Sequence, residues 1–114
     1  MARDPRAYLW DVREAALAIQ SFTAGMDAEG FAVHPMAQAS VERKFEIIGE
    51  ALNQLSRLEP ALAGRIPELP RIVAFRNLLI HSYAAVDVGT VWNTVQRSLP
   101  GLMAKVQELL DELG

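Results

Sequence analysis

Apolar residues recur along the chain at the spacings of amphipathic helices, and no stretch shows the alternation typical of a β-strand. The first helix is predicted from about residue 5 to 23, because Asp4 can cap it and Pro5 needs no backbone donor there. Its core stripe advances by three and four residues. The stripe contains Leu9, Val12, Ala16, Ile19 and Thr23, with Tyr8, Ala15 and Phe22 beside it.

Residues 24–35 are predicted to form a loop, because Gly30 and Pro35 interrupt the helical pattern. His34 in this loop has no acidic or histidine neighbour that would suggest a metal site, so it is predicted to be a surface residue. A second helix is predicted from about 35 to 58, with a core seam at heptad spacing. The seam contains Val41, Phe45, Ile48, Leu52 and Leu55.

A second row on this helix contains Glu42, Glu46, Gly49 and Asn53. Glycine inside a helix costs about 1 kcal/mol relative to alanine, and its missing side chain lets another backbone approach. A close approach is therefore predicted at Gly49, and the alternative is that Glu42 and Glu46 are exposed and Gly49 is incidental.

The second half of the chain predicts two further long helices. Four residues break the chain before the third helix, which is predicted from about 68 to 83, and residues 59–67 have room for one short extra turn. These breaks are Pro60, Gly64, Pro67 and Pro70. Asp87 is a plausible cap for a last helix, whose heptad stripe continues across Pro100 and so predicts a kink. The predicted fold is an all-α, up-and-down bundle of four to five helices in a single domain, residues 1–114.

Polar residues stand out in the apolar third helix, at Arg76, Asn77, His81 and Tyr83. At about 100° per residue, Tyr83 lies two turns above Arg76, and His81 lies about 140° round the helix from Arg76. Val73 and Ile80 lie between these edges and are expected to form a dry floor. A buried arginine without a partner costs several kcal/mol, so Glu46 or Glu50 of the second helix is the expected partner of Arg76.

The pair Arg76 and His81 combines a permanent cation with a group that exchanges protons near neutral pH. Phosphate-ester chemistry needs both functions. The same residues also fit a structural role, with His81 donating to a backbone carbonyl in the core, Arg76 in a buried salt bridge and Tyr83 as a packing residue.

The run Arg76-Asn77-Leu78-Leu79-Ile80-His81-Ser82-Tyr83 resembles the R-x-x-x-x-H-x-Y motif of HepT-like toxins, which are HEPN-domain ribonucleases. The segment from Glu46 to Ala51 resembles the family's second helix. The last helix is also similar, at Val86-Asp87, Val91-Trp92 and Leu99-Pro100. The likeness therefore covers nearly the whole chain.

This resemblance implies a metal-independent endoribonuclease without a cofactor, acting as the toxin of a type II toxin–antitoxin pair. His81 would act as base or acid in attack by a ribose 2′-hydroxyl, Arg76 would stabilise the phosphorane, and Asn77 would orient the phosphate or His81. The family's partner is a nucleotidyltransferase antitoxin, which would attach AMP to Tyr83. The alternative is a catalytically inactive HEPN-like module that binds a nucleotide or a partner.

A homodimer is also predicted, because Trp92, Leu78 and the second row of the 35–58 helix exceed what one small bundle can cover. The resemblance implies that the motif helices meet across the symmetry axis, so that two Arg76/His81 pairs line one cleft.

Composition narrows the cellular setting. The 114 residues include no cysteine, carry a net charge of −3 and contain no apolar run near the ~20 residues of a membrane span. A cytoplasmic protein is expected, and the two distant histidines predict no metal cluster.

The acidic charge argues against a general nucleic-acid coat. Residues 40–83 are the least acidic third. Besides Arg76, their basic residues are Arg43, Lys44, Arg57, Arg65 and Arg71, which suit a solvated surface or a local patch.

Overall fold

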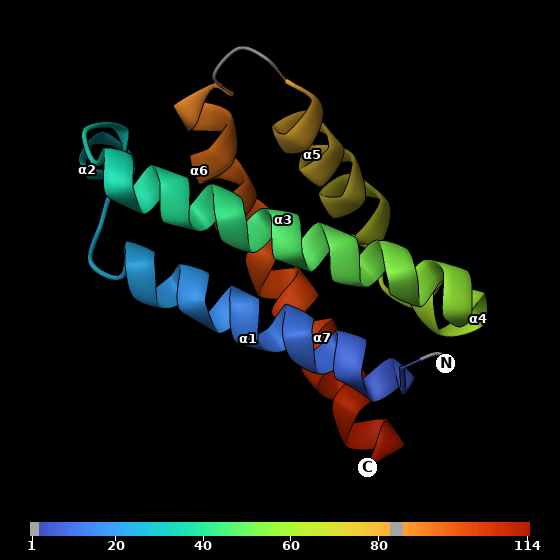
Figure 1. Cartoon of the computed structure of the whole chain (residues 1–114). Helices are drawn as coiled ribbons and strands as arrows, with labels where there is room; N and C mark the ends of the chain where they lie inside the picture. The colour runs from blue at the N-terminus through green and yellow to red at the C-terminus, as the bar shows by residue number, and fades with distance from the viewer. Residues whose placement is uncertain (1–2, 83–85) are drawn as a thin grey trace.

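The computed structural model describes residues 3–82 and 86–114, and within these ranges it contains seven helices and no strand. The all-α prediction is therefore confirmed. The helices are α1 (Pro5–Thr23), α2 (Ala28–Ala32), α3 (Pro35–Leu58), α4 (Pro60–Ala63), α5 (Leu69–His81), α6 (Val88–Arg97) and α7 (Leu99–Leu113). Figure 1 shows α1 and α3 running antiparallel, with α5 on α3 and α7 on α1.

The core forms where the heptad seam of α3 meets the stripe of α1. All five predicted seam residues and all five stripe residues are buried. α5 adds Ile72 and Phe75, and the Phe75 ring meets Phe45 edge-on with their centroids 5.2 Å apart. This anchor fixes α5 against the middle of α3.

The predicted loop over residues 24–35 is wrong, because it contains α2. Asp27 caps this single turn, accepting the Gly30 N–H at 2.7 Å. Phe31 is fully buried, and its ring lies 5.2 Å from that of the half-buried Trp92. Burial of this aromatic ring outweighs the low helix propensity of Gly30.

The predicted kink of the last helix lies at Ser98, between α6 and α7. The Ser98 N–H donates to Thr94 O at 3.0 Å, and Ser98 O accepts from Leu102 N at 3.1 Å. Pro100 follows in the first turn of α7 and lacks the donor that would continue the ladder. Asp87 caps α6, as predicted, by accepting the Thr90 N–H.

Two other boundaries bear on the site. The predicted short turn within 59–67 is confirmed as α4. α5 ends at His81 instead of continuing to residue 83, and Ser82 closes it by donating its N–H to Leu78 O. Tyr83 lies outside the described residues. None of the described helices combines the length and the hydropathy that crossing a membrane requires.

Candidate active site

Arg76 lies where α5 crosses α3, with 19% of its side chain exposed. Its Nη2 forms an ion pair with Glu50 Oε2 of α3, and its Nη1 donates to Asn77 Oδ1 at 2.8 Å. Of the two expected partners, Glu50 is therefore the one that contacts Arg76. The guanidinium is held from both sides, so its orientation is set before any ligand arrives.

Gly49 makes this approach possible. A Cβ built at Gly49 would overlap Cβ and Cγ of Arg76. The stem of Arg76 therefore lies against bare α3 backbone, one residue before the glutamate that pairs with it. The predicted close approach at Gly49 is real, although a side chain rather than a backbone makes it.

Gln54 supports the same cluster and was not singled out from the sequence. Its Nε2 donates to Glu50 Oε1 at 3.0 Å, so both carboxylate oxygens of Glu50 have partners. Its position, four residues after Glu50 on the same helix face, was the available signal. A chain of contacts thus runs Gln54–Glu50–Arg76–Asn77 from α3 to α5.

His81 is the last residue of α5 and is exposed. Within the described part of the chain its ring forms no hydrogen bond, so it is not a core histidine bonded to a backbone carbonyl. Five residues separate it from Arg76, which corresponds to about 7.5 Å along the helix axis. The two groups share one helix, and His81 lies about 140° round it from Arg76, on the solvent side of α5.

The outer face of α5 differs from the predicted dry floor. Val73 is half-buried, but Ile80 is 40% exposed and Leu78 is 48% exposed. The expected dry floor is therefore wrong at Ile80 in a single chain, whereas the exposure of Leu78 agrees with the prediction that one bundle cannot cover it. Leu78 and Ile80 flank the exposed Asn77 and His81 on the outer side of α5, and all four side chains are open to solvent.

Glu46 and Glu42 extend the acidic row of α3 away from Glu50. Glu46 contributes no ion pair to Arg76, because Glu50 occupies that role. Burial, together with the nearby charge of Glu46, raises the pKa of Glu42. Among the described residues, no group of three His, Cys, Asp or Glu side chains is arranged to hold a metal.

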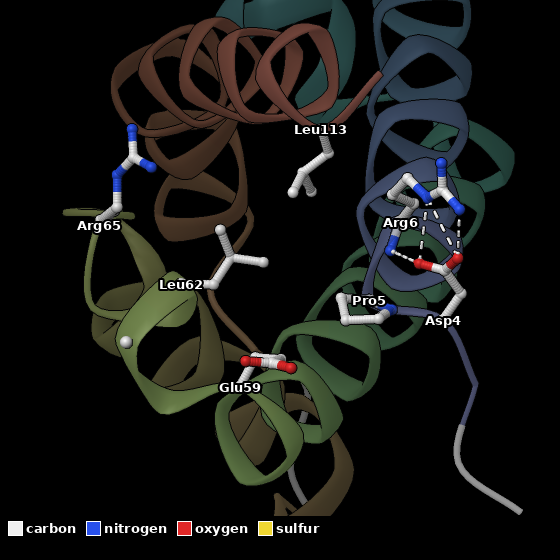
Figure 2. Close-up of a pocket in the computed structure, with 8 residues that line it drawn as sticks. Asp4, Pro5, Arg6, Glu59, Leu62, Arg65 and Leu113 are labelled. Atoms are coloured by element: carbon white, nitrogen blue, oxygen red, sulfur yellow. Dashed lines mark hydrogen bonds and ion pairs between the residues drawn. The ribbon is translucent and has the colours of Figure 1, made fainter.

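A separate cavity of about 620 Å³ lies at the opposite end of α5, near α4 and both ends of the chain. Figure 2 shows Leu62 and Leu113 on its walls and Arg6 turned onto Asp4, to which its Nη2 donates at 2.6 Å. The Arg6 guanidinium lowers the pKa of Asp4. This cavity contains none of the motif residues.

Comparison with known proteins gives one consistent result. The family model described as "Ribonuclease HepT-like" matches residues 12–109. A probable ribonuclease HepT of Thermococcus cleftensis is 38% identical over 113 residues, covering 96% of this chain and 98% of that protein. The putative RNase MJ1380 of Methanocaldococcus jannaschii is 32% identical, covering 92% and 95%. No solved structure matches the chain significantly.

Proposed function

Because the chain belongs to the HepT-like ribonuclease family, we propose that it is a metal-independent endoribonuclease and the toxin of a type II toxin–antitoxin pair. The observation that carries this proposal is the oriented guanidinium of Arg76 on the same helix as the exposed His81. Because its proposed substrate is RNA, the proposed site of action of the protein is the cytoplasm.

In the proposed reaction, His81 removes the proton of a ribose 2′-hydroxyl as that oxygen attacks the adjacent phosphorus. The phosphorane gains negative charge, which Arg76 stabilises. The bond to the 5′-oxygen then breaks, the leaving oxygen takes up a proton, and a cyclic 2′,3′-phosphate forms. DNA lacks the 2′-hydroxyl nucleophile and is not cleaved by this route.

Arg76 retains donors for this task. A guanidinium has five N–H groups, and within the described residues two of them are used, by Glu50 and Asn77. The other donors are free to bind phosphate oxygens. Asn77 contacts Arg76, so its proposed role is to orient the guanidinium toward the phosphate.

The proposed assembly is a homodimer in which the outer faces of two α5 helices meet. The exposed Leu78 and Ile80 supply apolar surface beside Asn77 and His81. A second copy would cover that surface and bring a second Arg76/His81 pair into one cleft. One imidazole could then act as the base while the other protonates the leaving oxygen.

The proposed antitoxin is a nucleotidyltransferase that attaches AMP to Tyr83. This residue follows His81 by two positions. An AMP group there would bring a phosphate and a bulky base next to the catalytic histidine, where charge and volume would both exclude RNA.

The second candidate is a catalytically inactive HEPN-like module that binds a nucleotide or a partner. The ion pair between Arg76 and Glu50 favours it, because this pair balances the charge of the guanidinium without any ligand. In that case Arg76 would mainly join α5 to α3.

One experiment separates the two candidates. Purified wild type and His81→Ala are incubated with total RNA in excess chelator, with His34→Asn as the matched control. His34 caps α3 by accepting the Ala37 N–H at 3.0 Å, and asparagine preserves such a cap. Cleavage by wild type and His34→Asn but not by His81→Ala is expected. Equal RNA cleavage by His81→Ala would refute the proposed role of His81, and no cleavage by any of them would favour the binding module.

A further inference from the structure

A groove of about 290 Å³ between α1 and α3 adjoins the Arg76 site but takes no part in the proposed cleavage step. Glu50 lines this groove and also pairs with Arg76, so the groove and the site share one carboxylate. We propose that the groove binds the base of a guanine nucleotide in the RNA, next to the phosphate that is cleaved. This inference rests on the proposed ribonuclease function and adds a base preference to it.

The first argument is the state of the groove's carboxylates. Asp11 is paired with Arg3 at 2.8 Å, and Glu50 is occupied by Arg76 and Gln54. Within the described residues, Glu46 has neither an ion pair nor a hydrogen bond from its side chain. Of the three carboxylates in the groove, Glu46 is therefore the one that has both oxygens available to a ligand.

A free carboxylate distinguishes guanine from the other bases by geometry. Guanine presents two adjacent donors, N1–H and the N2 amino group, which match the two oxygens of a carboxylate. Adenine and cytosine each place an acceptor beside their amino group, and uracil has a single N–H between two carbonyls. Glu46 can accept a paired hydrogen bond from guanine alone.

The second argument is the aromatic wall. Tyr8 lines the groove, and the guanidinium of the half-exposed Arg3 lies over its ring, 4.7 Å from the centroid. Stacking of a base on an aromatic side chain is worth about 1–3 kcal/mol, whereas an exposed cation–π contact contributes about 0.5–1 kcal/mol. The exposed ion pair of Arg3 with Asp11 adds about 0–1 kcal/mol, so a base that stacks in the upper part of its range can take the place of Arg3 on this ring.

The charge balance of the groove selects a base over a bare anion. Its lining contains three carboxylates, Asp11, Glu46 and Glu50, against the two guanidinium groups of Arg3 and Arg43. A free phosphate would meet net repulsion. A base supplies donors to the carboxylates. The exposed Arg43, three positions before Glu46, forms no ion pair with any residue that the structure describes, so it can bind the backbone phosphate of the same nucleotide.

Titration of nucleoside monophosphates, followed by calorimetry, tests the groove without requiring cleavage. GMP is expected to bind wild type about tenfold more tightly than AMP, CMP or UMP, and Glu46→Gln is expected to lose this advantage. Glu29→Gln on α2 removes an exposed carboxylate outside the groove, and this variant should still bind GMP more tightly than the other nucleotides. Tyr8→Ala should weaken binding of all four nucleotides, while Tyr8→Phe should preserve it.

Mapping of RNA ends after digestion of total RNA connects the groove to cleavage. Wild type should cut next to guanine, and Glu46→Gln should cut with that preference reduced. Cleavage without guanine preference, together with equal affinity for the four nucleotides, would overturn this inference and leave the ribonuclease function intact. Selective GMP binding by a protein that cleaves no RNA would instead overturn the proposed function, and with it the role of the groove in cleavage.

Discussion

Replacing Gly49 with alanine is the most direct test of how Arg76 is positioned. Alanine gains about 1 kcal/mol of helix propensity over glycine. Its Cβ would overlap Cβ and Cγ of Arg76, and because the Arg76 Cβ is fixed to the backbone, α5 itself must move. Overpacking of this kind costs about 1–3 kcal/mol. The net destabilisation is therefore expected to reach up to about 2 kcal/mol, or up to about 8 °C in melting temperature.

The RNA cleavage rate of Gly49→Ala should fall by more than its loss of stability explains. A displacement of about 1 Å in a positioning group can cost roughly 10²-fold in rate, and the overlap moves Arg76 directly. The assay compares cleavage rates at a temperature where circular dichroism shows the variant to be folded. Rates near wild type in a folded variant would refute the reasoning that Gly49 sets the place of Arg76.

Gly101→Ala is the matched control. A Cβ at Gly101 in α7 would lie 3.9 Å from the nearest atom, Cγ of Glu68, which is an ordinary contact. The same substitution is therefore expected to raise the melting temperature by up to about 4 °C and leave RNA cleavage unchanged. A loss of stability in both variants would show that the steric argument does not distinguish the two sites.

Four further predictions concern assembly, metal dependence, pH dependence and modification. Leu78→Glu should give a monomer in sedimentation, because it places a charge on the exposed side of α5. The control Leu113→Glu, at the end of α7, should stay dimeric. Cleavage should survive excess EDTA, and activity that vanishes and returns with one divalent ion would contradict the mechanism. Because the pKa of Glu42 is raised in the folded state, its favourable contribution to the free energy of unfolding is complete below the unfolded-state pKa. That contribution is lost as pH rises through the folded-state pKa. Glu42→Gln should therefore melt higher than wild type at pH 7 and no higher at pH 3. Tyr83→Phe should keep cleavage yet escape AMP addition by a cognate nucleotidyltransferase, which intact mass and growth on co-expression would show.

The long helices could be predicted from the sequence because local signals and core periodicity agree in them. α1 begins where Asp4 and Pro5 predict it, and α3 has the predicted bounds, 35–58. α2 was missed because Gly30 and Pro35 read as breakers. Asp27 as a cap and Phe31 as a buried anchor were the signals for it, and a single turn is too short for periodicity to reveal.

The contact between Arg76 and α3 was partly foreseeable, because a buried guanidinium requires a carboxylate and Gly49 marks a gap in the facing helix. The choice of Glu50 over Glu46 depends on where α5 crosses α3, and no pattern within either helix encodes the crossing point. The role of Gln54 depends on that choice, since it lies one helical turn after Glu50 and donates to that carboxylate.

Sequence periodicity and the fold disagree on the outer face of α5. Periodicity identifies Leu78 and Ile80 as apolar, but it cannot say which element covers them, and in the single chain none covers them fully. Leu78 and Ile80, exposed on the helix that carries Arg76 and His81, are the apolar side chains that the proposed homodimer would cover. If each of these two side chains gained about 1 kcal/mol on burial, two copies would gain about 4 kcal/mol from four side chains. The pairing of copies and the assembly of a two-histidine site would then be the same event, so dilution should reduce RNA cleavage more steeply than in proportion to protein concentration.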